Sequence, residues 1–254
     1  MPQKKSRPLA GWRVLVPRGG EWGNSIAASL RGHGAEPVIS PMVNFASTDR
    51  VDELADALTR LRSGDFDWVL ITTAATVDVL VSQDVDLPPR TRLAAVGENS
   101  VSALRLGGYP VDFTLAGDQS AENLIEKWSV ERGSRVLILS PEAPWIELEG
   151  VTRSLGLHAE TVVAYRTVGI SVPDEVRSGV AEGTIGAVLV TSGSVAKQVR
   201  DQLSPLPADT LVAAIGPRTA FDARALGIEI DVIAEELTEE ALIGALVAHL
   251  AQRR

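Results

Sequence analysis

Short runs of consecutive apolar residues recur along the chain, and segments with helical spacing separate them. Residues 68–71 (WVLI) and 187–190 (AVLV) are apolar throughout, as expected for strands buried on both faces of a parallel sheet. Residues 50–63, in contrast, carry an apolar residue at every third or fourth position, which is the spacing of a helix with one buried face. Strands that alternate with helices predict an α/β fold with parallel sheets covered by helices on both faces.

The same reading gives an expected element order. Further strands are expected at 13–17, 93–96, near 111, 135–139, 211–215 and 229–232, and further helices at 98–107, 121–131, 173–182, 194–203, 218–226 and 239–251. Two other segments, around 37–45 and 161–169, carry β-branched residues without helical periodicity, and we expect them to be extended. Thr238 is the expected N-cap of the last helix.

Part of this pattern occurs twice. Residues 68–80 align with 187–199, and residues 95–112 align with 214–231, both at an offset of 119 positions and without a gap. An offset shared by separate motifs indicates a tandem duplication of one α/β unit. Weaker similarities support it, relating RVLV from residue 13 to RVLI from residue 135, and GHGAEPV from residue 32 to GLHAETV from residue 156. The two extended segments lie about one repeat apart, so we expect them to be equivalent and to pair as a linker.

Hydroxyl-bearing loops follow the apolar runs of the repeat. Thr191, Ser192 and Ser194 come after one expected strand, and Thr219 comes shortly after the next. Any one of these residues is explained by helix capping. Hydroxyls after several strands, all at carboxyl ends, also predict a ligand site, because open α/β sheets bind ligands at that edge. Backbone N–H groups at helix starts can hold an anion there without a lysine.

Composition narrows the possible functions. The chain has a net charge of −9 and a pI near 4.9, which argues against nucleic-acid and acidic-membrane binding. It contains no cysteine, which excludes disulfides, thiol catalysis and cysteine-ligated metals. No apolar run reaches membrane-spanning length, and we expect a soluble, cytoplasmic protein.

Other chemistries have weaker support. Gly19, Gly20 and Gly23 follow the first strand with GGxxG spacing, which differs from the GxGxxG of dinucleotide-binding loops and suits a tight turn. The three histidines lack metal-ligand spacing, so no metal site is expected. No GxSxG motif is present, and no histidine–acid pair accompanies the hydroxyls. A glutamate pair among residues 142–149 is better explained as a solvated helix face.

Taken together, the motifs resemble the uroporphyrinogen-III synthase family. The resemblance covers nearly the whole chain and rests on RVLVPR, WVLITTAATVDVL, AVGENSVSALRLGG, VVAYR, VLVTSGSV, AIGPRTA and TEEAL, in that order. It implies two flavodoxin-like, doubly wound parallel-sheet lobes joined by a two-stranded antiparallel linker, with the active site in the cleft between them. It also implies a discontinuous first lobe of 1–36 plus 168–254, a second lobe of 46–160, and linker segments at 37–45 and 161–167.

The implied activity is a cofactor-free lyase reaction of porphyrin and heme biosynthesis. The substrate would be hydroxymethylbilane, a linear tetrapyrrole rich in carboxylates, which cyclises to uroporphyrinogen III with ring D inverted through a spiro intermediate. Because the bilane also closes unaided to the type I isomer, catalysis would consist mainly of controlling its folding, with help to the leaving hydroxyl. We expect a monomer with no cofactor, metal, nucleic-acid or membrane partner.

The resemblance also assigns roles to residues. Tyr165 matches the family's linker tyrosine and is the candidate acid for the leaving hydroxyl. One departure is Ser140 and Pro141, which stand after RVLIL where the family often has Arg-Gly. This departure leaves open a non-catalytic two-lobe module that binds a tetrapyrrole or another polycarboxylate. The residues matched to substrate binding are Arg18, Thr72, Thr73, Ser100, Thr191, Ser192, Ser194, Gly216, Pro217 and Thr219.

Overall fold

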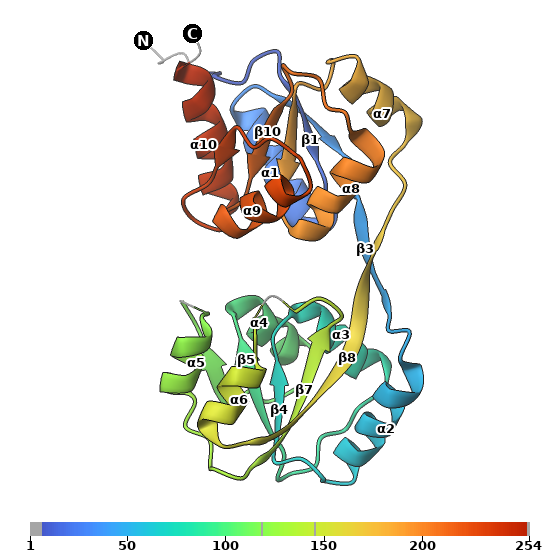
Figure 1. The fold of residues 1–254 in the computed structure, drawn as a ribbon, viewed down its shortest axis with the longest axis vertical. Helices are drawn as coiled ribbons and strands as arrows, with labels where there is room; N and C mark the ends of the chain where they lie inside the picture. The colour runs from blue at the N-terminus through green and yellow to red at the C-terminus, as the bar shows by residue number, and fades with distance from the viewer. Residues whose placement is uncertain (1–6, 118, 145, 253–254) are drawn as a thin grey trace. The chain divides into compact units, whose positions relative to one another are not determined.

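The structure, a computed structural model, describes residues 7–117, 119–144 and 146–252 (Figure 1). The chain divides into two compact units: unit 1 consists of Met1–Asn44 with Val168–Arg254, and unit 2 of Phe45–Thr167. Each unit contains a sheet of mainly parallel strands with helices on both faces, which confirms the expected fold class. Within the described residues, the helices are too short or too polar to cross a bilayer.

Unit 1 has a five-stranded parallel sheet whose order is β11-β10-β9-β1-β2. Read in the order in which they occur within the unit, these strands give 2-1-3-4-5 from one edge to the other, the doubly wound order of flavodoxin-like folds. The strands are β1 (Arg13–Val16), β2 (Glu36–Ile39), β9 (Ala187–Val190), β10 (Leu211–Ala214) and β11 (Val232–Ile233). The helices are α1 (Gly20–Gly32), α7 (Asp174–Ala181), α8 (Gly193–Leu203), α9 (Pro217–Ala225) and α10 (Glu239–Gln252).

Alternating side chains of β1 show how the helices cover both faces of this sheet. Val14 packs in a buried cluster with residues of α1 and α10, whereas Leu15 packs in a second cluster with residues of α7 and α8. A sheet buried on both faces requires strands that are apolar at every position, as AVLV at β9 is. Thr238 caps α10, because its hydroxyl accepts a hydrogen bond from the Ala241 backbone N–H at 3.2 Å.

Unit 2 has a six-stranded sheet of order β3-β8-β7-β4-β5-β6. Two buried clusters again lie on its faces, one with residues of α2, α3 and α4, the other with residues of α5 and α6. The strands are β3 (Val43–Ser47), β4 (Trp68–Ile71), β5 (Arg92–Val96), β6 (Phe113–Leu115), β7 (Arg135–Pro141) and β8 (His158–Gly169). The helices are α2 (Val51–Arg62), α3 (Ala74–Ser82), α4 (Glu98–Leu106), α5 (Ala121–Lys127) and α6 (Glu149–Leu155).

The duplication extends to the strand registers. Arg13 pairs with Glu36 in unit 1, and Arg135 pairs with His158 at the equivalent position of unit 2. Leu15 pairs with Val188, and the equivalent Leu137 pairs with Val69. The β9–β10 and β10–β11 registers match those of β4–β5 and β5–β6 in the same way. Unit 1 therefore has the strand arrangement of unit 2, but is assembled from the two ends of the chain.

The expected linker at 37–45 is partly wrong. Glu36–Ile39 forms β2, which pairs with β1 at the edge of the unit 1 sheet, and only the later part of the segment enters β3. Pro37 is compatible with this position because an edge strand leaves one side of its backbone without a pairing partner. The segment at 161–167 lies within β8, which pairs with β7 as far as Tyr165. These segments thus belong largely to the two sheets.

The chain leaves unit 1 through β3 and returns through β8, and the two strands are neighbours in the sheet (Figure 1). They run in opposite directions, as Figure 1 shows, in agreement with the expected antiparallel linker. In unit 1, Gln202 of α8 fixes the returning chain: its side chain donates to the Ile170 carbonyl at 2.9 Å and accepts from the Val172 N–H at 2.8 Å. In unit 2, Arg166 forms an ion pair with Asp49 at 3.1 Å.

The helix expected at 121–131 is shorter in the structure and ends at Lys127. Trp128, which follows it, has an extended backbone and a side chain that is only 2% exposed. Its ring stacks on Phe113 with centroids 6.0 Å apart and meets Trp68 edge to face at 5.6 Å. Burial of this large ring against the sheet outweighs the helical preference of the residues that follow.

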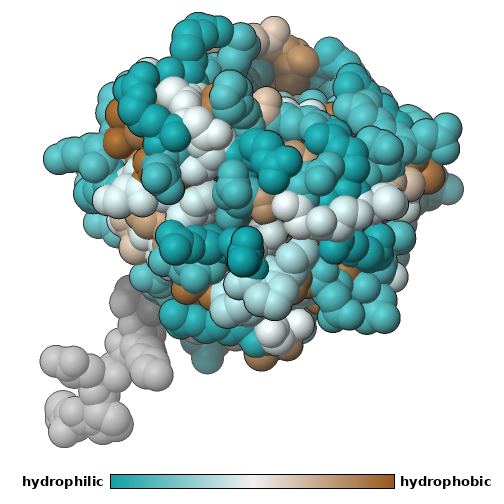
Figure 2. Space-filling view, turned by 90° about the horizontal axis from the view of Figure 1, so that it is seen from below, coloured by the Kyte–Doolittle hydropathy of each residue, from teal (hydrophilic) through white to brown (hydrophobic). Residues whose placement is uncertain are grey.

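Hydrophilic residues dominate the face of the molecule in Figure 2, with apolar residues scattered among them. Large apolar side chains that are exposed come from different elements, such as Phe45 of β3, Leu106 of α4 and Phe221 of α9. Scattered exposure of this kind is normal for a protein surface and by itself indicates no binding site.

Candidate functional site

The topology of each unit marks one edge of its sheet as the candidate site. Because the paired strands of the unit 1 sheet are parallel, their carboxyl ends meet at one edge. The helices that follow β1 and β9 contribute to clusters on opposite faces, so the loops after these strands diverge. Such a switch point is where doubly wound sheets bind ligands. The equivalent loops of unit 2 follow β7 and β4.

At the switch point of unit 1, Ser192 and Thr191 differ in their hydrogen bonding. Ser192 is the N-cap of α8, and its hydroxyl accepts a hydrogen bond from the Val195 N–H at 3.2 Å. Capping therefore accounts for Ser192. The Thr191 hydroxyl oxygen is buried and has no hydrogen-bond partner among the described residues. A buried unpaired hydroxyl is costly, so Thr191 is the hydroxyl of this loop that a ligand or water would best satisfy.

The second loop of unit 1 ends at Gly216, the N-cap of α9, and Pro217 is the first residue of the helix. Proline suits this position because its missing N–H would have no helical partner. Thr219, in the first turn of α9, is only 8% exposed. The neighbouring Arg218 pairs with Asp222 at 3.0 Å. A Cβ on Gly193 would lie 2.9 Å from the Asp222 carboxylate, so the start of α8 is in close contact with α9.

Arg18 is exposed and follows β1, so unit 1 has a cation beside its switch point. Its guanidinium lies 5.0 Å from the centre of the Trp22 ring. Although the residue as a whole is exposed, desolvation of its guanidinium lowers the pKa of Arg18, and Glu239 at the start of α10 opposes this shift only in part. The side chain remains cationic at neutral pH. A Cβ on Gly23 would overlap the Arg18 carbonyl oxygen, so glycine is required where α1 passes this loop.

In unit 2, Tyr165 and Thr73 are in direct contact. The Tyr165 hydroxyl donates a hydrogen bond to the Thr73 hydroxyl oxygen at 3.0 Å, and the tyrosine is 6% exposed. Burial raises the pKa of Tyr165, while the hydrogen bond with Thr73 opposes this shift. The Phe45 ring meets the Tyr165 ring edge to face, with centroids 5.1 Å apart. Phe45 is 53% exposed and was not among the residues selected from the sequence.

The other two predicted residues of unit 2 are buried. Thr72 is 4% exposed and lies in the loop after β4, and Ser100 is 2% exposed in the first turn of α4. The helix is preceded by Gly97, whose φ of +82° favours glycine. The Gln119 side chain packs against Gly97, since a Cβ there would lie 3.0 Å from its amide atoms. Gln119 is thus a further polar side chain at this edge, which the sequence did not single out.

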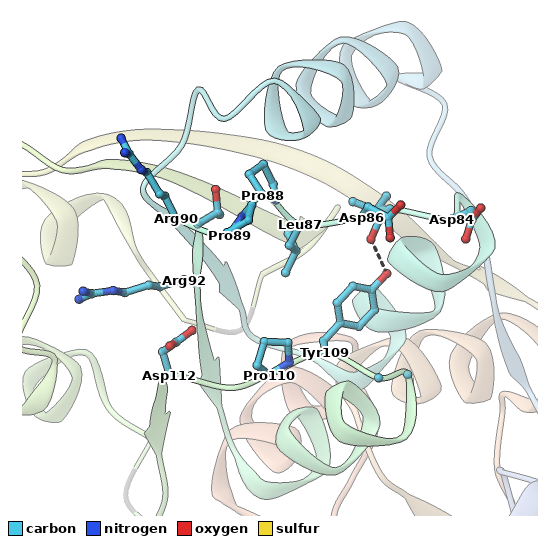
Figure 3. A pocket seen from close by; sticks show the side chains of 14 residues that line it. Asp84, Asp86, Leu87, Pro88, Pro89, Arg90, Arg92, Tyr109, Pro110 and Asp112 are labelled. Carbon is cyan, nitrogen blue, oxygen red and sulfur yellow. Dashed lines mark hydrogen bonds between the residues drawn. The ribbon is translucent and has the colours of Figure 1, made fainter.

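A cavity of about 740 Å³ lies at the opposite edge of the unit 2 sheet and is lined by residues 84–92, 107–110 and 112 (Figure 3). Tyr109 points across it, and its hydroxyl donates to the Val85 carbonyl at 2.9 Å. Unit 1 has a cavity of about 590 Å³ in the equivalent segments, lined by residues 204–208, 210, 212, 226–229 and 231, with Arg200. The cavity recurs with the repeat, and none of the predicted site residues lines it. We therefore place the candidate site at the carboxyl edges.

The chain is similar to known proteins along most of its length. The family described as HEM4, uroporphyrinogen-III synthase HemD, matches residues 24–244. A crystal structure of a mutant uroporphyrinogen III synthase from the extremely thermophilic bacterium Thermus thermophilus is similar, with a TM-score of 0.61 and 18% identity. The similarity covers 95% of this chain and 99% of that one, and at this identity it shows a shared fold.

Two curated relatives match at the level of sequence. The uroporphyrinogen-III synthase of Synechococcus elongatus is 25% identical, covering 94% of this chain and 96% of the relative. The porphyrin biosynthesis protein HemD of Ruminiclostridium josui is 26% identical over 95% of this chain. That match spans only 49% of the Ruminiclostridium protein, so the chain corresponds to about half of its length.

Proposed function

Because the chain belongs to the uroporphyrinogen-III synthase family, we propose that it cyclises hydroxymethylbilane to uroporphyrinogen III. The observation that carries the proposed mechanism is the hydrogen bond from the Tyr165 hydroxyl to Thr73 beside the switch point of unit 2. A tyrosine phenol is protonated at neutral pH, and burial raises the pKa of Tyr165 further, so the residue has a proton to give as an acid. The reaction needs an acid because hydroxide is a poor leaving group.

In the proposed reaction, the Tyr165 phenol gives its proton to the terminal hydroxyl of the bilane, and the C–O bond breaks to release water. The pyrrole nitrogen electrons stabilise the resulting azafulvene-like cation. Ring D attacks it through its already substituted carbon and forms the spiro centre, which fragments and recloses with ring D inverted. The proton lost from carbon as the macrocycle closes restores the phenol, so the net change is the loss of one water. No step requires an oxidant or a metal.

The loops at the carboxyl edges of both sheets would bind the carboxylates of the substrate. Backbone N–H groups at helix starts attract anions locally, even in a protein of net charge −9. In unit 1 the proposed groups are the Thr191 hydroxyl, the start of α9 and the Arg18 guanidinium, with Ser192 and Ser194 beside them. In unit 2 they are Thr72, Thr73 and Ser100. Binding at several loops restricts the conformations of a flexible bilane, which is the main requirement of the reaction.

One observation favours a second candidate, a binding module without turnover. Ser140, at the switch point of unit 2, is 3% exposed, and its hydroxyl donates to the adjacent Pro141 carbonyl at 3.1 Å. The residue therefore offers no cation to the substrate where the family often has one. A module of this kind would bind the tetrapyrrole without changing the isomer that forms. We expect a monomer in either case, which analytical ultracentrifugation measures.

Product isomer analysis tests the proposal. Hydroxymethylbilane is generated fresh and incubated with the purified protein, and the product is oxidised and separated into type I and type III porphyrins. We expect mainly type III, formed faster than the unaided closure. If only type I forms, at the rate seen without protein, turnover is excluded. Quenching of tryptophan fluorescence by added uroporphyrin would then identify a binding module.

A further inference from the structure

The N-cap hydroxyls of the two repeats have different partners. Ser192 and Thr73 stand at equivalent positions, before α8 and α3 respectively. The Ser192 hydroxyl accepts a hydrogen bond from the N–H three residues later, which is ordinary capping. The Thr73 hydroxyl makes no such capping bond. It contacts the Tyr165 hydroxyl at 3.0 Å and the Thr76 hydroxyl at 2.9 Å instead.

Thr76 is the residue that distinguishes the two loops. It is fully buried in the first turn of α3, and the equivalent residue of α8 is Val195. The repeated fold therefore accepts an apolar residue of the same shape at this position. A buried threonine carries the cost of desolvating its hydroxyl, which a hydrogen bond must offset. In unit 2 that bond is made with Thr73, whose other contact is the phenol.

We propose that Thr76 is a positioning residue for the reaction, acting through Thr73 on the Tyr165 hydroxyl. The inference rests on the proposed role of Tyr165 as the acid. The three hydroxyls form a chain that runs from the buried interior of α3 to the phenol. Each hydroxyl has one proton, so the hydrogen bonds among the three hydroxyls can run in either direction.

The direction in which the three hydroxyls donate their hydrogen bonds explains how Thr76 would act on Tyr165. At rest the Tyr165 hydroxyl donates to Thr73. When the phenol turns its proton to the leaving hydroxyl, Thr73 can donate to the phenol oxygen, and Thr76 can donate to Thr73. Hydrogen bonds in such a chain strengthen one another and stabilise the negative charge that develops on the phenol oxygen. Thr76 would thus make Tyr165 a stronger acid without touching the substrate.

Charged groups near Tyr165 do not explain the acidity of its phenol. Burial and the Thr73 hydroxyl are the two causes of the Tyr165 pKa shift. The neighbouring Arg166 is paired with Asp49, and the contact of Glu142 with Tyr165 is a backbone hydrogen bond of 3.0 Å. Removal of the Thr76 hydroxyl should therefore change the acidity of the phenol through Thr73.

The kinetic test uses Thr76→Val, which reproduces the residue of the other repeat. We expect kcat to fall about two- to tenfold, the effect of one hydrogen bond, with KM within about twofold of its original value. The alkaline limb of the kcat profile should move to higher pH, because the phenolate is less well stabilised. Thr76→Ser keeps a hydroxyl and should restore both properties.

Thr91→Val is the matched control. Thr91 is a buried threonine of unit 2 whose hydroxyl donates to the Phe66 carbonyl at 2.8 Å. It precedes β5, at the opposite edge of the sheet from the candidate site. This variant should lose stability of a similar order to Thr76→Val while its kcat and pH profile stay unchanged.

A second test needs no activity. The chain has two tyrosines, so Tyr109→Phe leaves Tyr165 as the one phenol that titrates. The tyrosinate absorbance of this variant is followed against pH, with and without Thr76→Val. We expect Thr76→Val to raise the titration midpoint by about 0.3 to 1 pH unit, matching the kinetic effect.

The outcomes separate this inference from the proposed function. An unchanged midpoint, together with unchanged kcat in Thr76→Val, would show that Thr76 only packs and would overturn the inference. A folded Thr76→Ser that behaves like Thr76→Val would also overturn it. If the unmodified protein forms no type III product, the proposed function fails, whereas the titration still decides whether the three hydroxyls are coupled.

Discussion

Arg18 and Ser140 occupy the same position in the two repeated units, each five residues after the arginine that begins its strand. The strand registers of the two sheets agree three residues earlier, where Leu15 pairs with Val188 and Leu137 pairs with Val69. Arg18 places an exposed cation beside the switch point of unit 1. Ser140 is buried, and its hydroxyl is bonded to its own strand. The repeats have therefore diverged here in charge and in backbone, since β1 ends at Val16 whereas β7 continues to Pro141.

Arg18→Gln should weaken substrate binding. We expect KM to rise about tenfold, the effect of one charge-assisted hydrogen bond, with kcat nearly unchanged because the contact is present throughout the reaction. Stability should fall by at most about 1 kcal/mol, since the variant removes mainly the cation–π interaction with the Trp22 ring. Steady-state kinetics and urea denaturation measure the two effects.

Arg224→Gln is the control for charge alone. Arg224 is an exposed arginine in the last turn of α9, so it belongs to the same unit but lies away from the start of that helix. The KM of Arg224→Gln should equal that of the unmodified protein. An equal rise in KM for both variants would show that Arg18 acts through the overall charge and would contradict a direct contact.

Gly23→Ala should disturb the Arg18 loop. The new Cβ would overlap the Arg18 carbonyl oxygen, which is backbone and cannot turn away as a side chain can. We expect a loss of about 1–3 kcal/mol in the free energy of unfolding, together with a raised KM. Gly244→Ala provides the contrast: nothing lies within 4 Å of its Cβ position in α10, so helix propensity should raise stability by about 1 kcal/mol.

The free energy of unfolding should fall at alkaline pH because the two tyrosines ionise more readily in the unfolded chain. Burial is the main cause that raises the pKa of Tyr109 and of Tyr165 above the ordinary value of 10.0. The unfolded chain therefore ionises its phenols at lower pH than the native protein does. Their stabilising effect is complete below about pH 10 and is lost as pH rises through the native pKa values.

Melting temperatures measured between about pH 8 and pH 11 test this expectation. Other groups also titrate in this range, so the comparison is between variants. Tyr109→Phe and Tyr165→Phe should each show a shallower decline than the unmodified protein. Curves that remain parallel to that of the unmodified protein would show that the phenols do not contribute.

Much of the fold could be predicted from the sequence, because the hydrophobic periodicity and the internal repeat indicated the same elements. The continuously apolar β4 and β9 lie at the centres of their sheets, and the offset between them anticipated equal registers. The linker boundary was less predictable. Pro37 reads as the edge of an extended segment, yet it lies inside β2, where an edge position tolerates proline. Likewise, the end of α5 depends on where Trp128 finds aromatic partners.

The candidate site was only partly accessible from sequence. Tyr165 and Thr73 are 92 positions apart, and their contact depends on the pairing of β8, β7 and β4. The contact of Phe45 with Tyr165 depends on the pairing of β3 with β8, and the sequence around Phe45 gives no sign of it. Thr76 has the appearance of an ordinary helix residue. Its difference from Val195 was visible in the aligned repeats, and only the structure shows what that hydroxyl contacts.

The most direct measurement of the central claim is the rate of type III formation by Tyr165→Phe beside the unmodified protein. Loss of the acid should lower kcat about a hundredfold or more, while KM stays within about twofold, because the carboxylate-binding loops are intact. The released bilane should then close unaided, and type I porphyrin should accumulate. Turnover to type III at the original rate would contradict the account and remove Tyr165 from the mechanism.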